Sequence, residues 1–534
     1  MRGAAGLFPT RGQASLSPAC PPESGLSLHA ALTPLPMPAP LLLALDAGTT
    51  STRAVLFGLD GTVHATAQRP LQQHYPRPGW VEHDAVEIRD AAVSVLRDAL
   101  SGVDARTVAA IGIANQRETT VVWNRRTGAP VGPAIVWQDR RTAPDCLRLA
   151  EAGLGPHVEA TTGLRLDPYF SGTKLAWILD YTPGAREAAR SGDLAFGNVD
   201  AWLVWSLTGG PDRGVRATDV TNASRTMLWS LREARWDDEL LTALDIPSAV
   251  LPDVRPSAGD FGTTRVDLIG ATLPIRGVAG DQHAALIGQA CLAPGQTKTT
   301  LGTGAFLLMH TGRTPARSAH GLLTTVAYDL GDGPHFALEG SVFVAGAAVQ
   351  WLRDELGLVE TAEATAALAA SVPDTGGVVF VPAFTGLGAP VWDPDARGLI
   401  AGLTRGTSRA HLVRAALEAV AFQTRGVVDA MTADAGLALP ALRVDGGAAA
   451  NPILLQMLAD ALGAPVERPA LVEATAWGAA VLAGIAAGLV DPDDVASGWT
   501  ADVRAEPNPA SRLHTDGYRD WQRAVALARG WASG

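Results

Sequence analysis

The stretch ALDAGTTSTRAVLFGLDGTV, residues 44–63, decides the fold class of this chain. An apolar run ends at Asp46, and small hydroxyl residues follow at 48–52. A second apolar run leads to Asp60-Gly61, a dipeptide typical of tight hairpins. The pattern predicts three antiparallel strands with a carboxylate and several hydroxyls at the first turn. Such a turn suits a charged ligand, because backbone N–H groups cup anions and a carboxylate holds Mg²⁺ through water. Local hydrogen bonding in an ordinary turn favours the same residues.

The segments that follow alternate between helix and strand patterns. Asp84 precedes the amphipathic run AVEIRDAAVSVLRDAL, with Glu87 three residues on, which predicts a helix opened by a capping box. VAAIGIANQ, residues 108–116, is a continuous apolar run, typical of a strand covered by helices on both faces. This alternation predicts an α/β fold.

The same pattern returns in the second half. QTKTTLGTGAFLLMH, residues 296–310, again joins a Thr-rich stretch, a Gly-Thr-Gly turn and an apolar strand. Later, residues 441–462 predict a strand ending at Asp445, a Gly-Gly turn and a helix. That arrangement brings backbone N–H groups close to an anion, or it simply packs a strand tightly against a helix. The two hairpins predict a duplicated domain with a cleft between the copies, and we expect domains at 39–289 and 290–534.

Composition narrows the class of protein. The chain has 534 residues and a net charge of −12, which implies no general affinity for nucleic acid or anionic lipid. Its three cysteines, Cys20, Cys146 and Cys291, lie far apart, so we expect no disulfide framework and a reducing, cytoplasmic location. The uncharged run at 474–490 is rich in Ala and Gly and predicts a buried helix rather than a membrane span.

The beginning of the chain differs from the rest. Residues 1–38 have no periodicity, and prolines break up their apolar residues, so no signal peptide is expected. Met37 stands just before the first strand pattern. We therefore expect a disordered extension, or a start codon placed upstream of the true one.

Two motifs with charged residues are candidates for a catalytic or substrate-binding role. Asp281 follows the apolar strand pattern of PIRGVAGDQHAALIGQA, where a carboxylate could take a proton from a substrate hydroxyl or cap the next helix. Arg117 and Glu118 lie between two strand patterns in GIANQRETTVVWN. Adjacent opposite charges in a loop are usually solvated. The functional alternative is a clamp that donates to and accepts from the hydroxyls of a polyol, with aromatic residues as walls or as plain core.

Together these stretches resemble the FGGY carbohydrate kinases, and most closely the branch that phosphorylates glycerol. The resemblance runs from about Leu41 to Trp531 and rests on specific blocks in a fixed order: NQRETT, DPYFSGTK, TNASRTML, AGDQHAALIGQ, HGLLTT, LEGSVFVAGAAVQWLRDE, VPAFTGLGAP, GLTRGTSRAHLVRAALEAVAFQTR and LRVDGGAAAN. It implies two duplicated actin- and hexokinase-like (ribonuclease H-like) α/β ATPase domains around a central cleft. It also implies phosphorylation of glycerol to sn-glycerol 3-phosphate with ATP and Mg²⁺, the first step of glycerol catabolism.

The resemblance also implies roles for residues in the matching motifs. Asp281 matches the catalytic base, and Asp46 and Asp281 are implied as Mg²⁺ ligands that act through water. The residues implied to contact glycerol are Arg117, Glu118, Tyr169, Asp281, Gln282, Trp137 and Phe306. The residues implied to contact ATP or ADP are Thr49, Thr50, Ser51, Arg53, Gly302, Thr303, Gly346, Gln350, Gly447 and Asn451. Within this second set, Arg53 is expected near the transferred phosphoryl group.

The chain departs from the family pattern in several places, and two of them bear on function. Ala47 stands where Gln is common in the first hairpin, which removes a side-chain contact near the γ-phosphate and keeps the backbone cradle. In members that respond to fructose 1,6-bisphosphate, a Gly-rich loop before the base strand carries an Arg that binds phosphate. Here Ala271 and Thr272 stand at the Thr and Arg positions, so we expect a weak response or none.

Two other functions stay open at this point. A relative that phosphorylates another polyol or sugar, such as xylulose or erythritol, would share most of the motifs. A non-enzymatic actin-like scaffold, or an ATP-switched binding protein, would share the fold but would not need a base at Asp281. The resemblance implies a homodimer or homotetramer with glycerol as its small-molecule partner, no nucleic acid and no membrane insertion.

Overall fold

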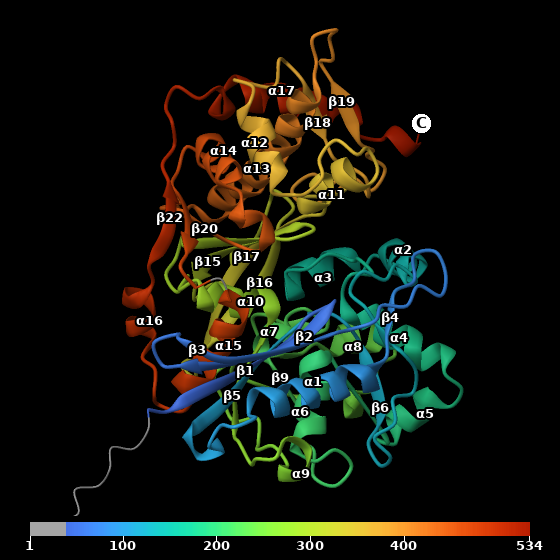
Figure 1. The fold of residues 1–534 in the computed structure, drawn as a ribbon. Helices are drawn as coiled ribbons and strands as arrows, with labels where there is room; N and C mark the ends of the chain where they lie inside the picture. The colour runs from blue at the N-terminus through green and yellow to red at the C-terminus, as the bar shows by residue number, and fades with distance from the viewer. Residues whose placement is uncertain (1–38, 472, 534) are drawn as a thin grey trace, which may run out of the picture. The chain divides into compact units, whose positions relative to one another are not determined.

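The computed structural model describes residues 39–471 and 473–533, so the expectations for residues 1–38 lie outside the described part. Its first sheet has the strand order β13-β5-β1-β2-β3 (Figure 1). The strands are β1 (Leu41–Ala47), β2 (Ser51–Gly58), β3 (Val63–Pro70), β5 (Val108–Asn115) and β13 (Ile275–Gly280). β1, β2 and β3 form the predicted antiparallel meander, whereas β5 and β13 run parallel to β1.

Helices cover both faces of the first sheet. They are α1 (Ala85–Ala99), α6 (Val199–Thr208), α10 (Asp281–Gly288) and α15 (Ala474–Ala486). Leu43 and Leu45 pack with α1 and α6 on one face, while Leu42 and Ala44 pack with α10 and α15 on the other. Figure 1 shows α15, coloured red, beside the blue strands of this sheet, although it comes hundreds of residues later. Coverage of both faces explains why the apolar run of β5 lacks alternation.

The second sheet repeats the first and extends it. Its strand order is β16-β17-β15-β14-β20-β21-β22. The strands are β14 (Thr297–Leu301), β15 (Ala305–Gly312), β16 (Leu323–Asp329), β17 (Pro334–Val342), β20 (Leu442–Asp445), β21 (Val466–Pro469) and β22 (Ala501–Ala505). In both sheets three antiparallel strands are followed by two parallel ones, because β17-β15-β14-β20-β21 corresponds to β3-β2-β1-β5-β13. This is the duplication that the two hairpins predict.

The remaining elements surround these sheets. In the first half they are β4 (Glu82–His83), β6 (Val121–Asn124), β7 (Ala134–Ile135), α2 (Ala143–Glu151), α3 (Gly155–Thr162), α4 (Ser171–Tyr181), α5 (Ala185–Arg190), β8 (Leu194–Gly197), β9 (Ala217–Asp219), α7 (Val220–Ala223), β10 (Trp229–Ser230), β11 (Arg235–Trp236), α8 (Asp238–Ala243), β12 (Asp253–Arg255) and α9 (Val266–Ile269). In the second half they are α11 (Gly346–Asp354), α12 (Ala364–Ala370), β18 (Val379–Val381), β19 (Leu399–Ala401), α13 (Arg409–Ala435), α14 (Pro452–Leu462), α16 (Pro492–Gly498) and α17 (Asp516–Ala528). Helices α13 and α14 pack on the second sheet in one large apolar core.

Helix α1 begins where the sequence predicts, but without the reciprocal capping box. The Asp84 carboxylate accepts a hydrogen bond from the backbone N–H of Val86 at 2.7 Å. The Glu87 carboxylate accepts from the N–H of Gln72 at 3.1 Å rather than from that of Asp84. The second half of the predicted box is therefore wrong, because the loop after β3 brings a competing donor to Glu87.

Glycines allow α10 and α15 to approach each other and the first sheet closely. A Cβ added at Gly478 would lie 1.8 Å from the carbonyl oxygen of Ala284, and one at Gly112 would lie 1.9 Å from that of Ala479. Real Cβ atoms do not approach backbone so closely, and backbone cannot swing aside as a side chain can. Residues 474–486 of the run at 474–490 therefore form a buried helix, as predicted, whereas residues 487–489 lie beyond the helix and are exposed. Packing requires glycine at Gly478 but not at Gly488.

Gly478→Ala is expected to lower the free energy of unfolding by at least about 2 kcal/mol, because overpacking against backbone forces α10 and α15 apart. Gly498→Ala is the matched control, since a Cβ at Gly498 would meet nothing within 4 Å. Denaturant unfolding of the two variants measures the difference. Equal midpoints for both variants would contradict the close packing of α10 on α15.

Within residues 39–471 and 473–533, no helix has the length and apolarity needed to cross a membrane. The two cysteines of this part, Cys146 and Cys291, are free and buried. Burial raises the pKa of both thiols to about 12, so neither is a reactive thiolate near neutral pH.

Candidate active site

The first hairpin places Asp46 and Arg53 opposite each other, at the ends of β1 and β2. Arg53 Nη2 lies 3.3 Å from Asp46 Oδ2, and Nη1 lies 2.7 Å from Glu473 Oε2 just before α15. Burial raises the pKa of Asp46 to about 6; Arg53 opposes this shift, and the neighbouring charge of Asp281 adds to it. Glu473 is a partner that sequence reasoning missed, because it lies 420 residues from Arg53.

Hydrogen bonds brace the hydroxyl-rich turn of this hairpin. Trp137 Nε1 donates to Thr49 Oγ1 at 3.0 Å, and Gln68 Nε2 donates to Ser51 Oγ at 2.9 Å. Thr50 is exposed at the tip. The bond from Trp137 joins two predicted sets, since Trp137 belongs to the glycerol set and Thr49 to the nucleotide set.

Asp281 is the first residue of α10 and directly follows β13. Its side chain is 30% exposed, and its Oδ1 lies 3.4 Å from Arg117 Nε. The backbone N–H of Gln282 donates to the same oxygen at 2.7 Å. Burial raises the pKa of Asp281 above its ordinary value, while Arg117 and the Gln282 N–H act against that shift. Gly280 is the N-cap of α10, so Asp281 is not its cap residue, although its carboxylate accepts from the N–H of Gln282 in the first turn.

Arg117 and Glu118 belong to a buried ion-pair network, so the solvated-pair interpretation is also wrong. Both residues are at most 3% exposed. Arg117 holds Glu339 with two hydrogen bonds, of 2.6 and 2.9 Å. Arg225 completes the network, donating to Glu118 at 2.6 Å and to Glu339 at 3.1 Å. Sequence reasoning gave no role to Arg225 or Glu339, although both lie in blocks that carry the resemblance, TNASRTML and LEGSVFV.

Backbone features bring this network beside Asp281. Glu118 has φ 57°, in the left-handed region, which turns the chain sharply after Arg117. A Cβ at Gly280 would lie 2.6 Å from Arg117 Cγ, so only glycine lets the Arg117 side chain pass there. The arginine is thus held between the end of β13 and the Glu339 carboxylate.

Three partly buried aromatic rings form a wall next to these charges. The ring centroid of Trp137 lies 5.7 Å from that of Tyr169 and 6.1 Å from that of Phe306, both in edge-on arrangements. Arg117 Nη2 lies 3.5 Å from the Tyr169 hydroxyl, which joins the wall to the ion pairs. The structure therefore brings the seven residues of the predicted glycerol set into one region, although their contact with glycerol stays a prediction.

Lys298 is a second buried cation at this site that sequence reasoning missed. It lies on β14 and is fully buried. Its Nζ donates to Gln282 Oε1 at 2.5 Å and to Thr300 Oγ1 at 2.9 Å. Burial lowers the pKa of Lys298, while Asp445 and Asp281 favour its charged form. The sequence gives no signal for this burial, because a lysine in a Thr-rich strand is as compatible with an exposed position as with a buried one.

A cavity of about 440 Å³ lies in the second half, between the second hairpin, α11, α13 and α14. Six of the predicted nucleotide residues line it: Gly302, Thr303, Gly346, Gln350, Gly447 and Asn451. The other four, Thr49, Thr50, Ser51 and Arg53, lie on the first hairpin and are not part of its lining. Much of the lining is apolar, including Leu417 and Val420, which suits a flat heterocycle. Binding of a nucleotide there stays a prediction.

The walls of this cavity depend on glycine. A Cβ at Gly346 would lie 2.5 Å from the carbonyl oxygen of Gly302, so α11 can begin directly beside the second hairpin. Gly346 N–H donates to that oxygen at 3.0 Å, and Ala345 N–H donates to the carbonyl of Thr303 at 2.9 Å. On the opposite wall Asn451 caps α14 by accepting from the N–H groups of Ile453 and Leu454.

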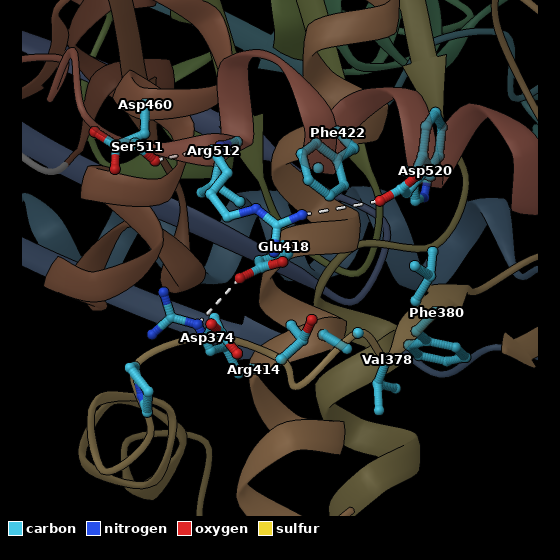
Figure 2. A pocket seen from close by; sticks show the side chains of 18 of the residues that line it. Asp374, Val378, Phe380, Arg414, Glu418, Phe422, Asp460, Ser511, Arg512 and Asp520 are labelled. Carbon is cyan, nitrogen blue, oxygen red and sulfur yellow. Dashed lines mark hydrogen bonds and ion pairs between the residues drawn. The ribbon is translucent and has the colours of Figure 1, made fainter. Parts of the chain in front are cut away.

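A second cavity, of about 340 Å³, lies on the other side of α13. Glu418 and Phe422 line it, whereas Leu417 and Val420 of the same helix line the first cavity. Figure 2 shows its charged side chains joined to one another: Arg414 to Glu418, 3.0 Å apart, and Arg512 to Asp520, 4.0 Å apart. It contains none of the predicted site residues, and four of its charged side chains form these two pairs.

The described residues contain no cluster of three His, Cys, Asp or Glu side chains that could hold a metal ion by themselves. Mg²⁺ bound to a nucleotide needs only one or two carboxylates, because phosphates and water complete its shell. Burial is the main cause that raises the pKa of Asp46, and the charge of Asp281 adds to it. Two carboxylates whose charges act on each other in this way fit a site that a cation would occupy.

Family models match most of the chain. The model of the FGGY carbohydrate kinase N-terminal domain matches residues 41–288, and that of the C-terminal domain matches residues 297–487. The chain belongs to the FGGY family of carbohydrate kinases. The α/β architecture with a repeated sheet is therefore that of an FGGY kinase, as the sequence motifs imply.

Curated relatives of this FGGY kinase include the glycerol kinase of Halorhodospira halophila, 55% identical over 92% of this chain and 97% of the relative. The glycerol kinase of Leptothrix cholodnii is also 55% identical, over 91% of this chain and 98% of the relative. Among solved structures, Plasmodium falciparum glycerol kinase with ADP has a TM-score of 0.87 at 34% identity, covering 92% of this chain and 98% of that one. Xylulose kinase from Rhodospirillum rubrum has a TM-score of 0.81 at 28% identity, covering 91% and 98% of the two chains.

Proposed function

We propose that this FGGY kinase transfers the γ-phosphoryl group of ATP to glycerol and forms sn-glycerol 3-phosphate. The observation that carries the proposal is a partly exposed carboxylate, Asp281, beside the buried Arg117–Glu118 pair, with three aromatic rings next to that pair. Glycerol has three hydroxyls on a short carbon skeleton, so it matches a site of this kind. The curated relatives named glycerol kinase support the same substrate.

The residues that surround the acceptor, glycerol, have different roles. Asp281 accepts the proton of the attacking hydroxyl, and Arg117 Nε beside it favours the ionised carboxylate that this needs. The hydrogen bond that Arg225 donates to Glu118 goes to Oε1, and Oε2 accepts from a second hydroxyl of the substrate. A site that hydrogen-bonds each hydroxyl discriminates strongly against molecules that lack one.

On the donor side, the cavity of the second half receives the nucleotide and the two hairpins approach its phosphates. Asp46 and Asp281 are the residues that would hold Mg²⁺, which would supply positive charge to neutralise the transferred group. Arg53, now held by Asp46 and Glu473, adds a guanidinium near the phosphoryl position. At the phosphate-binding turn of the first hairpin, Ala47 can contribute only its backbone groups, because its methyl side chain has no polar atom.

A substrate panel tests this proposal. With MgATP, we expect glycerol to give the highest kcat/KM in a coupled ADP-release assay, above erythritol and D-xylulose by at least about tenfold. Xylulose kinases share the fold, so a preference for D-xylulose would favour the second candidate function. ADP release that no polyol or sugar stimulates would favour a scaffold or a nucleotide-switched binding protein.

Fructose 1,6-bisphosphate is expected to inhibit weakly or not at all. Thr272 offers at most one neutral hydrogen bond, whereas an arginine fork offers two charge-assisted ones, each roughly twice as strong. The arginines that flank the loop are engaged elsewhere: Arg265 lies 2.9 Å from Asp212, and Arg276 lies 3.1 Å from Asp260. Initial rates at saturating glycerol and ATP, with the bisphosphate titrated to millimolar levels, check this. Saturable inhibition that Arg265→Ala or Arg276→Ala abolishes would show that one of them replaces the missing cation.

We further propose that the chain works in the cytoplasm as a homodimer or homotetramer. The free, buried thiols of Cys146 and Cys291 suit a reducing compartment. Light scattering at working concentration gives the mass of the assembly, and a monomeric mass would contradict the second part.

A further inference from the structure

Lys298 lies where the two halves of the site meet. It precedes the second hairpin on β14, four positions before Gly302, whereas its partner Gln282 follows Asp281 in the first turn of α10. One buried ammonium therefore connects the proposed base region of the first half to the proposed phosphate hairpin of the second. Thr300, on the same strand, provides its other hydrogen-bond partner.

This ammonium determines how the Gln282 amide is oriented. An ammonium group has three donors and no acceptor, so its partner on Gln282 must be the carbonyl oxygen rather than the nitrogen. The NH₂ group then occupies the other end of the amide. None of the described residues accepts a hydrogen bond from it, and the side chain is only 8% exposed. Gln282 thus offers a fixed and unused donor beside Asp281.

We propose that Lys298 is a positioning residue, which holds the Gln282 amide so that its NH₂ donates to the substrate hydroxyl next to Asp281. This inference rests on the proposed function. A hydroxyl whose oxygen accepts from Gln282 can give its own proton to Asp281, because an ionised carboxylate only accepts. The reversed amide would offer a carbonyl oxygen, which competes with Asp281 for that proton. Lys298 therefore acts through Gln282 and does not itself touch the substrate.

A double-mutant cycle separates this role from a merely structural one. Lys298→Met and Gln282→Ala are each expected to lower kcat/KM for glycerol by about tenfold, which corresponds to one lost hydrogen bond. The KM for ATP is expected to stay within about twofold. Because Lys298 acts through Gln282, the double variant is expected to be no worse than Gln282→Ala alone. Losses that multiply in the double variant would overturn the proposal.

Gln282→Glu gives an independent test if Lys298→Met fails to fold. A carboxylate at this position still pairs with Lys298 but has no NH₂ group, so glycerol kcat/KM is expected to fall at least about tenfold with an unchanged melting temperature. Retention of kcat/KM within about twofold would overturn the proposal. The wild-type protein in the same assay tests the proposed function separately: if another polyol is the better substrate, the cycle is run with that polyol, and non-additivity is still expected.

Discussion

Asp281→Asn is expected to lower turnover with glycerol by roughly 10²-fold or more, the size of effect that follows the loss of a positioned general base. The amide keeps the shape of the side chain but cannot take a proton from the attacking hydroxyl. The fold should survive, because Arg117 keeps its two hydrogen bonds to Glu339 when the charge of Asp281 is removed. Steady-state ADP release at saturating glycerol and MgATP measures the loss.

The control for this variant is Asp260→Asn, which removes an exposed negative charge of the same half whose ion pair with Arg276 lies at the surface; the amide oxygen can still accept from the N–H of Gly262. Its turnover is expected to equal that of the wild type. Glycerol binding to Asp281→Asn, followed by calorimetry, is expected to persist, because the Arg117–Glu118 pair and the aromatic wall are unchanged. Near-native turnover of Asp281→Asn would show that another group takes the proton.

Arg225→Ala is expected to lower the free energy of unfolding by about 3–5 kcal/mol, the usual effect of removing one partner from a buried ion pair. The Arg225 guanidinium is fully buried and bonds both Glu118 and Glu339. Without Arg225, the cation that remains near Glu118 among the described residues is Arg117, whose Nε lies 3.9 Å from Glu118 Oε1. The Glu118 carboxylate, whose pKa burial already raises, would then be poorly compensated.

Denaturant unfolding measures this effect, with Arg265→Ala as the control. Arg265 is 31% exposed and pairs with surface carboxylates, so its loss is expected to cost at most about 1 kcal/mol. The double variant Arg225→Ala, Glu118→Gln is expected to recover part of the stability lost by Arg225→Ala, because the uncompensated charge is removed. Equal destabilisation by Arg225→Ala and Arg265→Ala would contradict a buried network.

Local sequence patterns were sufficient for the elements that carry the site. The hydroxyl-rich turn after Asp46 and the Gly-Thr-Gly turn at 302–304 predict hairpins from composition alone, and both hairpins are present. Asp445 is the last residue of β20 and Asp281 directly follows β13, as their positions after apolar runs predict. These predictions succeed because each depends on a few adjacent residues.

The charge network could not be predicted in the same way, because its members come from distant segments. Nothing in NQRETT indicates that Arg117 pairs with Glu339, which lies 222 residues away. Adjacent Arg and Glu residues are usually solvated, whereas here Gly280 leaves room for the Arg117 side chain and Arg225 pairs with Glu118. The same holds for Lys298 and Glu473, whose partners lie across the two halves. Pairing of buried charges is a property of tertiary packing rather than of local sequence.

The most direct test of the proposed activity is a stoichiometry measurement with the full chain, MgATP and glycerol. The ADP formed is compared with the sn-glycerol 3-phosphate formed, the latter detected by a dehydrogenase specific for that isomer. The proposal predicts ADP release that depends on glycerol, with one sn-glycerol 3-phosphate formed for each ADP. ADP release that is independent of glycerol, or a phosphorylated product that the dehydrogenase does not oxidise, would contradict it.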